Sequence, residues 1–155
     1  GHSAKLGRAV DKAREAETEP EKKAAFGVDP TKSGGVKTQT HHLIPGELRR
    51  ENPLVRLGAS HGYNIDAASN GVRLPVSEDD SVKLGLPQHL GSHPAYTAAV
   101  ARPLARAAQG LDPAEASSKL VPALKEAEQE VRSQVLDAGG AITINDVKPD
   151  FKVDV

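Results

Sequence analysis

The sequence contains no cysteine, methionine or tryptophan, and only two tyrosines and two phenylalanines among its 155 residues. The absence of cysteine excludes disulfides, thiolate metal ligands and a cysteine nucleophile, so any metal ion must be held by His, Asp or Glu. Because aromatic residues make up only 3% of the chain, the core must be built from Ala, Val and Leu. The length and composition favour one compact unit that is rich in helices.

Long hydrophobic runs and a large net charge are missing as well. No apolar run approaches the roughly 20 residues of a membrane span, and none near the N-terminus resembles a secretory signal. We therefore expect no membrane span and no classical signal peptide. The 20 Lys and Arg residues and 21 Asp and Glu residues leave a net charge of -1. This value excludes a protein that binds nucleic acid nonspecifically through a large positive net charge.

Turn-forming residues and charge divide the chain into three parts. Residues 1–35 are predicted to be a charged helical lead-in or linker, which ends in glycine- and proline-containing turns. Residues 36–109 form the central domain. Residues 110–155 form a helical extension that packs on this domain and ends in a short strand over Ala141–Ile144. Short strands among several helices predict the α+β class.

Two short strands and a short helix are predicted in the central part. One strand spans Val36–Ile44 and ends at a proline, and the other spans Gly71–Pro75. Between them, Asn52 is a helix N-cap and Pro53 the first helical residue of a short helix that covers Leu54–Ser60 and ends near Gly62.

Two longer helices are predicted from apolar stripes. One begins after His93, and Pro103 should kink or split it; its buried face comprises Tyr96, Val100, Leu104 and Ala107. Asp112-Pro113 and Glu115 predict the start of another helix. Its stripe continues from Leu120 to Val135, with a break near Val121 because of Pro122.

The histidines form two close pairs, His41-His42 and His89-x-x-x-His93. Side chains four residues apart lie on one face of a helix, so two imidazoles can converge on one metal ion, although two histidines bonded to loops would show the same spacing. Adjacent residues on a strand point to opposite faces, so one of His41 and His42 can bind metal while the other faces substrate. Phosphodiester hydrolysis needs both a cation and a base that works near neutral pH.

The residues Thr40-His41-His42-Leu43-Ile44-Pro45, Asn70-Gly71-Val72-Arg73-Leu74-Pro75 and His89-Leu90-Gly91-Ser92-His93-Pro94 resemble the AHH-type branch of the HNH endonuclease superfamily. This branch is found mostly as C-terminal toxin domains of bacterial polymorphic toxins and secretion-system effectors. The resemblance covers residues 37–104. Thr40 stands where this branch usually has alanine.

The resemblance implies a ββα-metal core embedded in several α-helices. It implies that His41, His89 and His93 bind one divalent metal ion, and that His42 is the general base. Asn70 would brace the hairpin and hold the backbone of the base. Imidazole ligands suit Zn and Ni, whereas Mg prefers oxygen ligands, and Mn is a further candidate for the working ion.

Other polar residues of the central part have predicted roles that are less specific. Arg49, Arg50 and Arg73 are candidates for contacts with DNA phosphates, with a solvated surface position as the alternative for each. Asp66 is assigned to turn chemistry between the strands.

The resemblance implies a metal-dependent, sequence-nonspecific DNase toxin domain that cuts target-cell DNA in interbacterial competition. Its partners would be DNA, a cognate immunity protein, and a larger parent toxin or secretion system that delivers it. It would be a secreted effector without a classical signal peptide, acting in the target-cell cytoplasm. The alternatives are a non-catalytic helical binding or adaptor domain with a structural His–metal site, and a metal hydrolase that acts on RNA.

Overall fold

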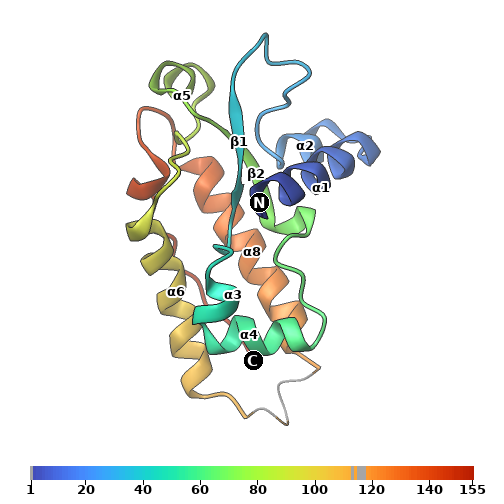
Figure 1. Cartoon of the computed structure of the whole chain (residues 1–155), viewed down its shortest axis with the longest axis vertical. Coiled ribbons are helices and arrows are strands. Elements are labelled where there is room, and N and C mark those ends of the chain that lie inside the picture. Colours follow the sequence, from blue (N-terminus) through green and yellow to red (C-terminus); the bar gives the residue numbers. More distant parts are fainter. Residues whose placement is uncertain (1, 113, 115–117) are drawn as a thin grey trace.

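The computed structural model describes residues 2–112, 114 and 118–155, which form an α+β fold with a small two-stranded sheet among helices, as predicted (Figure 1). The strands are β1 (Thr38–His42) and β2 (Gly71–Pro75). The helices are α1 (His2–Ala16), α2 (Pro20–Ala24), α3 (Leu48–Glu51), α4 (Pro53–Ser60), α5 (Glu78–Leu84), α6 (Pro94–Gln109) and α8 (Leu120–Asp137), with 3-10 turns η1 (Ala68–Asn70) and η2 (Ile144–Asp146).

The two strands pair antiparallel, with His41 opposite Val72 and His42 opposite Gly71. β1 is shorter than predicted because the backbone ladder stops at its end. The Ile44 N–H donates to the side-chain oxygen of Asn70 (2.8 Å) instead of to a strand carbonyl. β2 has the predicted bounds. The backbone hydrogen-bond ladder between the strands therefore ends where the segment after β1 diverges from the segment before β2.

Helix α1 is a packed element, which corrects the prediction of a solvated lead-in. Leu6 and Val10 are fully buried, and they lie so close to Gly71 that a Cβ atom there would come within 2.5 Å of Val10. One helical turn separates Leu6 from Val10, so two apolar residues suffice to cover this small sheet. The predicted domain boundary after residue 35 stays a prediction.

Helices α4 and α6 follow their predicted starts. The Asn52 side chain accepts hydrogen bonds from the N–H groups of Leu54 and Val55 and caps α4. Tyr96, Val100 and Leu104 are fully buried, as their spacing predicts.

The expected split at Pro103 is wrong, because α6 continues through this residue to Gln109. Burial of Val100 and Leu104 on both sides of the proline offsets the missing backbone hydrogen bond.

The C-terminal part agrees with its prediction at one place and differs at another. A turn at residues 118–119 precedes α8, which starts at Leu120, so a helix boundary lies next to the predicted break near Val121. Pro122 lies in the first turn of α8, where its missing N–H costs no helical bond. The terminal strand is wrong: Thr143 forms only an isolated bridge with Gln88 and then caps η2 together with Asp146. The predicted helix start at Asp112–Glu115 involves residues 113 and 115, which lie outside the described residues.

One hydrophobic core connects these elements. In Figure 1, α6 runs along one flank of the molecule and α8 passes behind the strands. Tyr96 of α6 donates its hydroxyl hydrogen to the carbonyl of Leu43 (2.6 Å), just after β1. α8 contributes five buried apolar side chains to the same core, namely Leu120, Leu124, Ala127, Val131 and Val135. Within the described part of the chain, no helix is both long enough and apolar enough to span a membrane.

Candidate metal centre

Three histidines from separate parts of the chain meet beside the small sheet. His41 is the penultimate residue of β1, His93 is the N-cap of α6, and the His89 N–H donates to the carbonyl of Pro75 at the end of β2 (2.8 Å). One nitrogen from each imidazole lies within 4.8 Å of the others, so these three side chains could hold a metal ion.

The protonation of these imidazoles fits a cation site. Burial, together with His89 and His93, holds the pKa of His41 well below its ordinary value. Burial and His93 lower the pKa of His89 to about 4. Both rings are therefore neutral at pH 7, which is the form that binds metal.

An unsatisfied atom also points to a ligand. His41 is only 1% exposed, and its Nε2 is buried without a hydrogen-bond partner among the described residues. A buried nitrogen without a partner is costly unless something occupies its lone pair. A divalent ion that accepts imidazole nitrogen, such as zinc or nickel, fits this donor set.

Hydrogen bonds to the far ring nitrogens orient the other two imidazoles. His89 donates from Nδ1 to the Gln39 side-chain oxygen (2.8 Å). His93 donates from Nδ1 to the Thr97 hydroxyl oxygen (3.2 Å), and this hydroxyl in turn donates to the Glu47 carboxylate (3.0 Å). With the ring hydrogen on Nδ1, the Nε2 of each ring keeps a lone pair for a metal ion.

His42 pairs with a carboxylate on a different segment. Its Nε2 lies 2.9 Å from Oδ1 of Asp66, whose side chain is 4% exposed. If Nε2 donates to this carboxylate, Nδ1 is the acceptor nitrogen of the ring, as a general base requires.

Asp66 is the residue that sequence reasoning missed. Its assignment to a turn is correct for the backbone, since the Asp66 N–H donates to Asn64 (3.0 Å), but its carboxylate faces His42. No spacing rule connects the last residue of a strand with a turn residue 24 positions later.

Asn70 is fully buried between the two segments that leave the sheet. Its side-chain nitrogen donates to the carbonyls of Ile44 (3.0 Å) and Ile65 (2.9 Å), and its oxygen accepts from the Ile44 N–H (2.8 Å). Asn70 thus joins the segment after His42 to the segment that carries Asp66.

Comparison with family models identifies the group to which these features belong. A nuclease family of the HNH/ENDO VII superfamily with a conserved AHH matches residues 26–131, more than half of the chain. The chain belongs to the AHH nuclease family. The adjacent pair His41-His42, preceded by Thr40, lies within the residues that this family model matches. Searches of curated proteins and of solved structures returned no match.

A pocket of about 840 Å³ opens over the histidines of this AHH nuclease. Arg49 and Arg50 of α3 line it together with His42, His89 and His93. Two of the three arginines predicted to contact DNA are therefore positioned beside the candidate metal centre.

Arg73 lies elsewhere, which corrects its predicted role at the site. Its guanidinium donates to both oxygens of Asp11 (2.7 and 2.6 Å) and to the Thr38 hydroxyl (3.1 Å), and its side chain is only 17% exposed. β2 presents this residue to the face that α1 covers, so Arg73 connects α1 to the sheet of the AHH nuclease.

Proposed function

We propose that this AHH nuclease is a metal-dependent endonuclease that hydrolyses DNA phosphodiester bonds without sequence preference. The observation that carries the proposal is the convergence of three imidazoles at His41, whose Nε2 has no hydrogen-bond partner among the described residues. The next residue, His42, pairs with Asp66 beside this cluster. We also propose that β1, β2 and α6 correspond to a ββα-metal core.

In this mechanism, His41, His89 and His93 hold one divalent ion, which supplies positive charge to the scissile phosphate. Three protein ligands leave coordination positions open, as a catalytic site requires, whereas structural zinc sites are closed by four ligands. This difference favours the enzyme over an adaptor domain with structural zinc.

The residues around the ion have separate tasks. His42 takes a proton from the attacking water at Nδ1, and Asp66 holds the Nε2 hydrogen and stabilises the imidazolium that forms. Asn70 fixes the spacing of the segments that carry these two residues. Arg49 and Arg50 bind phosphates at the mouth of the pocket.

Plasmid nicking tests this proposal directly. Protein stripped with chelator would be assayed with Mg, Mn, Ni or Zn, on DNA and on RNA. We expect nicking of DNA that requires added metal, and a loss of about 100-fold or more in His42→Ala. His61→Ala is the matched control, because His61 is exposed and lies outside the lining of the metal pocket. Nicking in chelator, parental rates in His42→Ala, or cleavage of RNA alone would contradict the proposal.

We further propose that the domain is a toxin of interbacterial competition. It would act in the target-cell cytoplasm after delivery by a larger parent toxin or secretion system, and a cognate immunity protein would protect the producer. Membership of the AHH family and the resemblance to polymorphic-toxin domains support this context. Expression in bacteria without the immunity protein should arrest growth, and His42→Ala should be harmless. Equal growth with both proteins would count against the toxin role.

A further inference from the structure

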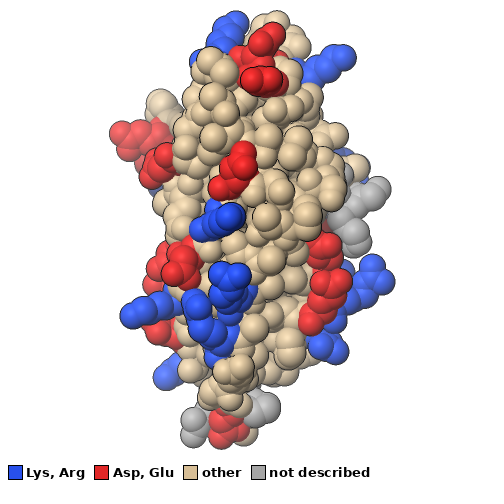
Figure 2. All heavy atoms as spheres, turned by 90° about the vertical axis from the view of Figure 1, so that its left-hand side faces the viewer, with Lys and Arg blue, Asp and Glu red and all other residues tan. Residues whose placement is uncertain are grey.

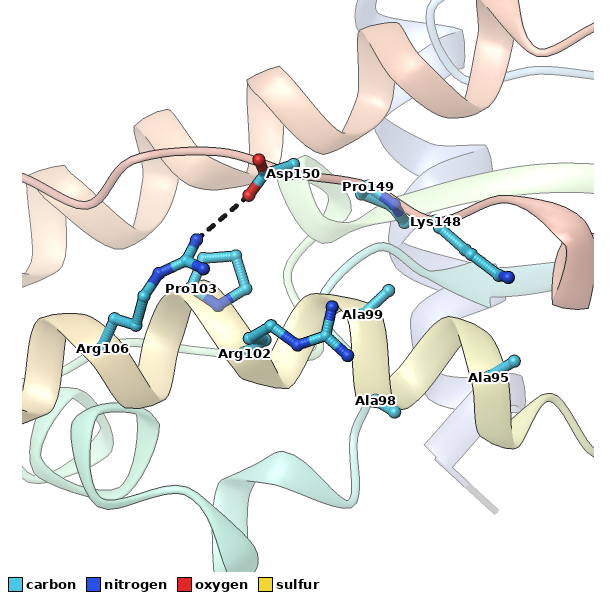
Figure 3. A pocket seen from close by; sticks show the side chains of 9 residues that line it. All are labelled: Ala95, Ala98, Ala99, Arg102, Pro103, Arg106, Lys148, Pro149 and Asp150. Carbon is cyan, nitrogen blue, oxygen red and sulfur yellow. Dashed lines mark hydrogen bonds and ion pairs between the residues drawn. The ribbon is translucent and has the colours of Figure 1, made fainter.

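Helix α6 borders a second pocket, separate from the metal pocket. Pro94 and Thr97 line the metal pocket, whereas Ala98, Arg102 and neighbouring residues line a cavity of about 450 Å³. Figure 3 shows this cavity between α6 and the extended chain at residues 148–150. We call it the α6 groove, lined by Ala95, Ala98, Ala99, Arg102, Pro103, Arg106, Lys148, Pro149 and Asp150.

The α6 groove concentrates positive charge. It contains three cations, Arg102, Arg106 and Lys148, and one anion, Asp150, although the whole chain has a net charge of -1. Arg102 and Lys148 are exposed, and neither forms an ion pair within the described part of the chain. Figure 2, which views the α6 side of the molecule, shows Lys and Arg side chains gathered on its lower half.

Arg106 can also become available to a ligand. Its guanidinium lies 3.1 Å from the carboxylate of Asp150, but the two side chains are 58% and 82% exposed. An ion pair this exposed contributes little stability, and it uses a single guanidinium nitrogen, whereas a phosphate can accept two hydrogen bonds from the same guanidinium.

The wall opposite α6 is held in place by the fold. The side-chain amide of Gln134 forms two hydrogen bonds with the backbone of Asp150: it accepts from the N–H (2.9 Å) and donates to the carbonyl (2.7 Å). Val147 and Pro149, on either side of Lys148, are buried. The backbone that carries Lys148 is therefore fixed before any ligand binds, which lowers the cost of binding.

We propose that the α6 groove binds backbone phosphates of duplex DNA that flank the bond cut at the metal centre. This inference rests on the proposed function. The floor of the groove consists of Ala and Pro side chains, which have no donors or acceptors for base edges, so the contacts are with phosphates only.

The common helix sets the distance between the two sites. Arg102 and Arg106 lie nine and thirteen residues beyond His93, about 14 and 20 Å along the axis of α6 at 1.5 Å per residue. If the duplex axis runs parallel to α6, these positions correspond, at 3.4 Å per base pair, to phosphates about four to six base pairs from the cut.

The test compares two double variants that remove equal charge. Arg102→Ala/Lys148→Ala changes the groove, and Lys83→Ala/Lys125→Ala removes two exposed lysines from α5 and α8. Binding of a labelled duplex would be followed by anisotropy in EDTA, which prevents cleavage, over a range of NaCl concentrations. For the groove variant we expect a Kd raised roughly tenfold or more and a slope of log K against log[salt] reduced by about 1.8, since each lost phosphate contact accounts for about 0.9.

The outcomes separate this inference from the proposed function. The groove proposal is overturned if the groove variant keeps the parental salt slope, if the control variant weakens binding equally, or if the groove variant loses affinity for poly-glutamate but not for DNA. The last result would indicate an acidic protein as the occupant. If the parent nicks no DNA with any metal but the groove variant still shows the reduced salt slope, phosphate binding by the groove stands and the catalytic proposal fails. Circular dichroism and zinc titration of both variants would show that the fold and the metal centre are intact.

Discussion

At the scale of single residues, Thr97 connects a candidate metal ligand to a carboxylate. Thr97→Val keeps the shape of the side chain but removes the hydrogen bonds to His93 and Glu47. We expect zinc affinity, measured by calorimetry, to fall by about 10- to 100-fold, because His93 loses the partner that fixes its ring. Thr97→Ser should retain the parental affinity. Equal affinities for the valine and serine variants would show that the hydroxyl does not orient His93.

The carboxylate of Asp66 can be tested apart from metal binding. Asp66→Asn can place an amide N–H against the Nε2 of His42, which would favour the wrong tautomer for a base. We expect plasmid nicking to slow by about 100-fold or more while zinc affinity stays unchanged. Parental nicking rates would remove Asp66 from the mechanism, and a parallel loss of zinc affinity would indicate a structural role.

Glu128 makes stability depend on pH. Burial raises its pKa, and Tyr63 donates its hydroxyl hydrogen to this carboxyl group (2.6 Å). The folded state therefore favours protonated Glu128, and this stabilisation is complete below the ordinary pKa and is lost as pH rises through the raised value. Glu128→Gln keeps an acceptor for Tyr63 but cannot ionise. In urea unfolding, we expect the variant to gain stability relative to the parent as pH increases from 4.5 towards neutral. A difference that does not change with pH would contradict this interpretation.

The sequence predicted some of these residues and missed others for clear reasons. His41, His89 and His93 stand in ordered motifs, so a family resemblance groups them from the sequence alone. The partners of His42 and Arg73 were not predictable in this way. Asp66 lies 24 residues from His42, and Asp11 lies 62 residues from Arg73, so only the folded chain brings each pair together.

At the scale of elements, α1 is a structural cover for the strands. Leu6→Ala removes a fully buried side chain that lies against Gly71. We expect this change to cost about 2 to 5 kcal/mol of unfolding free energy, measured by urea denaturation. Lys12→Ala, on the exposed face of α1, is the control and should cost little. A negligible loss in Leu6→Ala would mean that α1 does not stabilise the sheet.

The bounds of elements were predictable where local chemistry decides them. Asn52 and Pro53 mark the start of α4, and the spacing of Tyr96, Val100 and Leu104 gives the buried face of α6. Predictions failed where packing overrides local preference, as in the helix that continues through Pro103. They also failed for Ala141–Ile144, because only one residue of this segment finds a bridge partner.

At the scale of the whole molecule, a metal ion at this centre would stabilise the fold. The candidate ligands come from β1, from the segment between α5 and α6, and from the N-cap of α6, so the unfolded chain does not hold them together. At a zinc concentration of about 100 times Kd, the expected gain is about 2.7 kcal/mol, visible as a higher Tm in calorimetry. His41→Ala should abolish the gain, and His61→Ala should keep it. A Tm that does not respond to zinc, nickel or manganese would argue against the centre.

The all-imidazole composition of the candidate centre also links ion uptake to substrate affinity. Neutral ligands do not cancel the charge of a divalent ion, so the formal charge of the protein would rise from -1 to +1 on binding. A polyanion then binds the metal-bound protein more tightly than the metal-free protein. Thermodynamic reciprocity requires that the polyanion raise the affinity for the metal ion by the same factor. Each ligand would thus raise the affinity for the other, and a chelator that removes the metal ion would weaken the binding of the polyanion by the same factor.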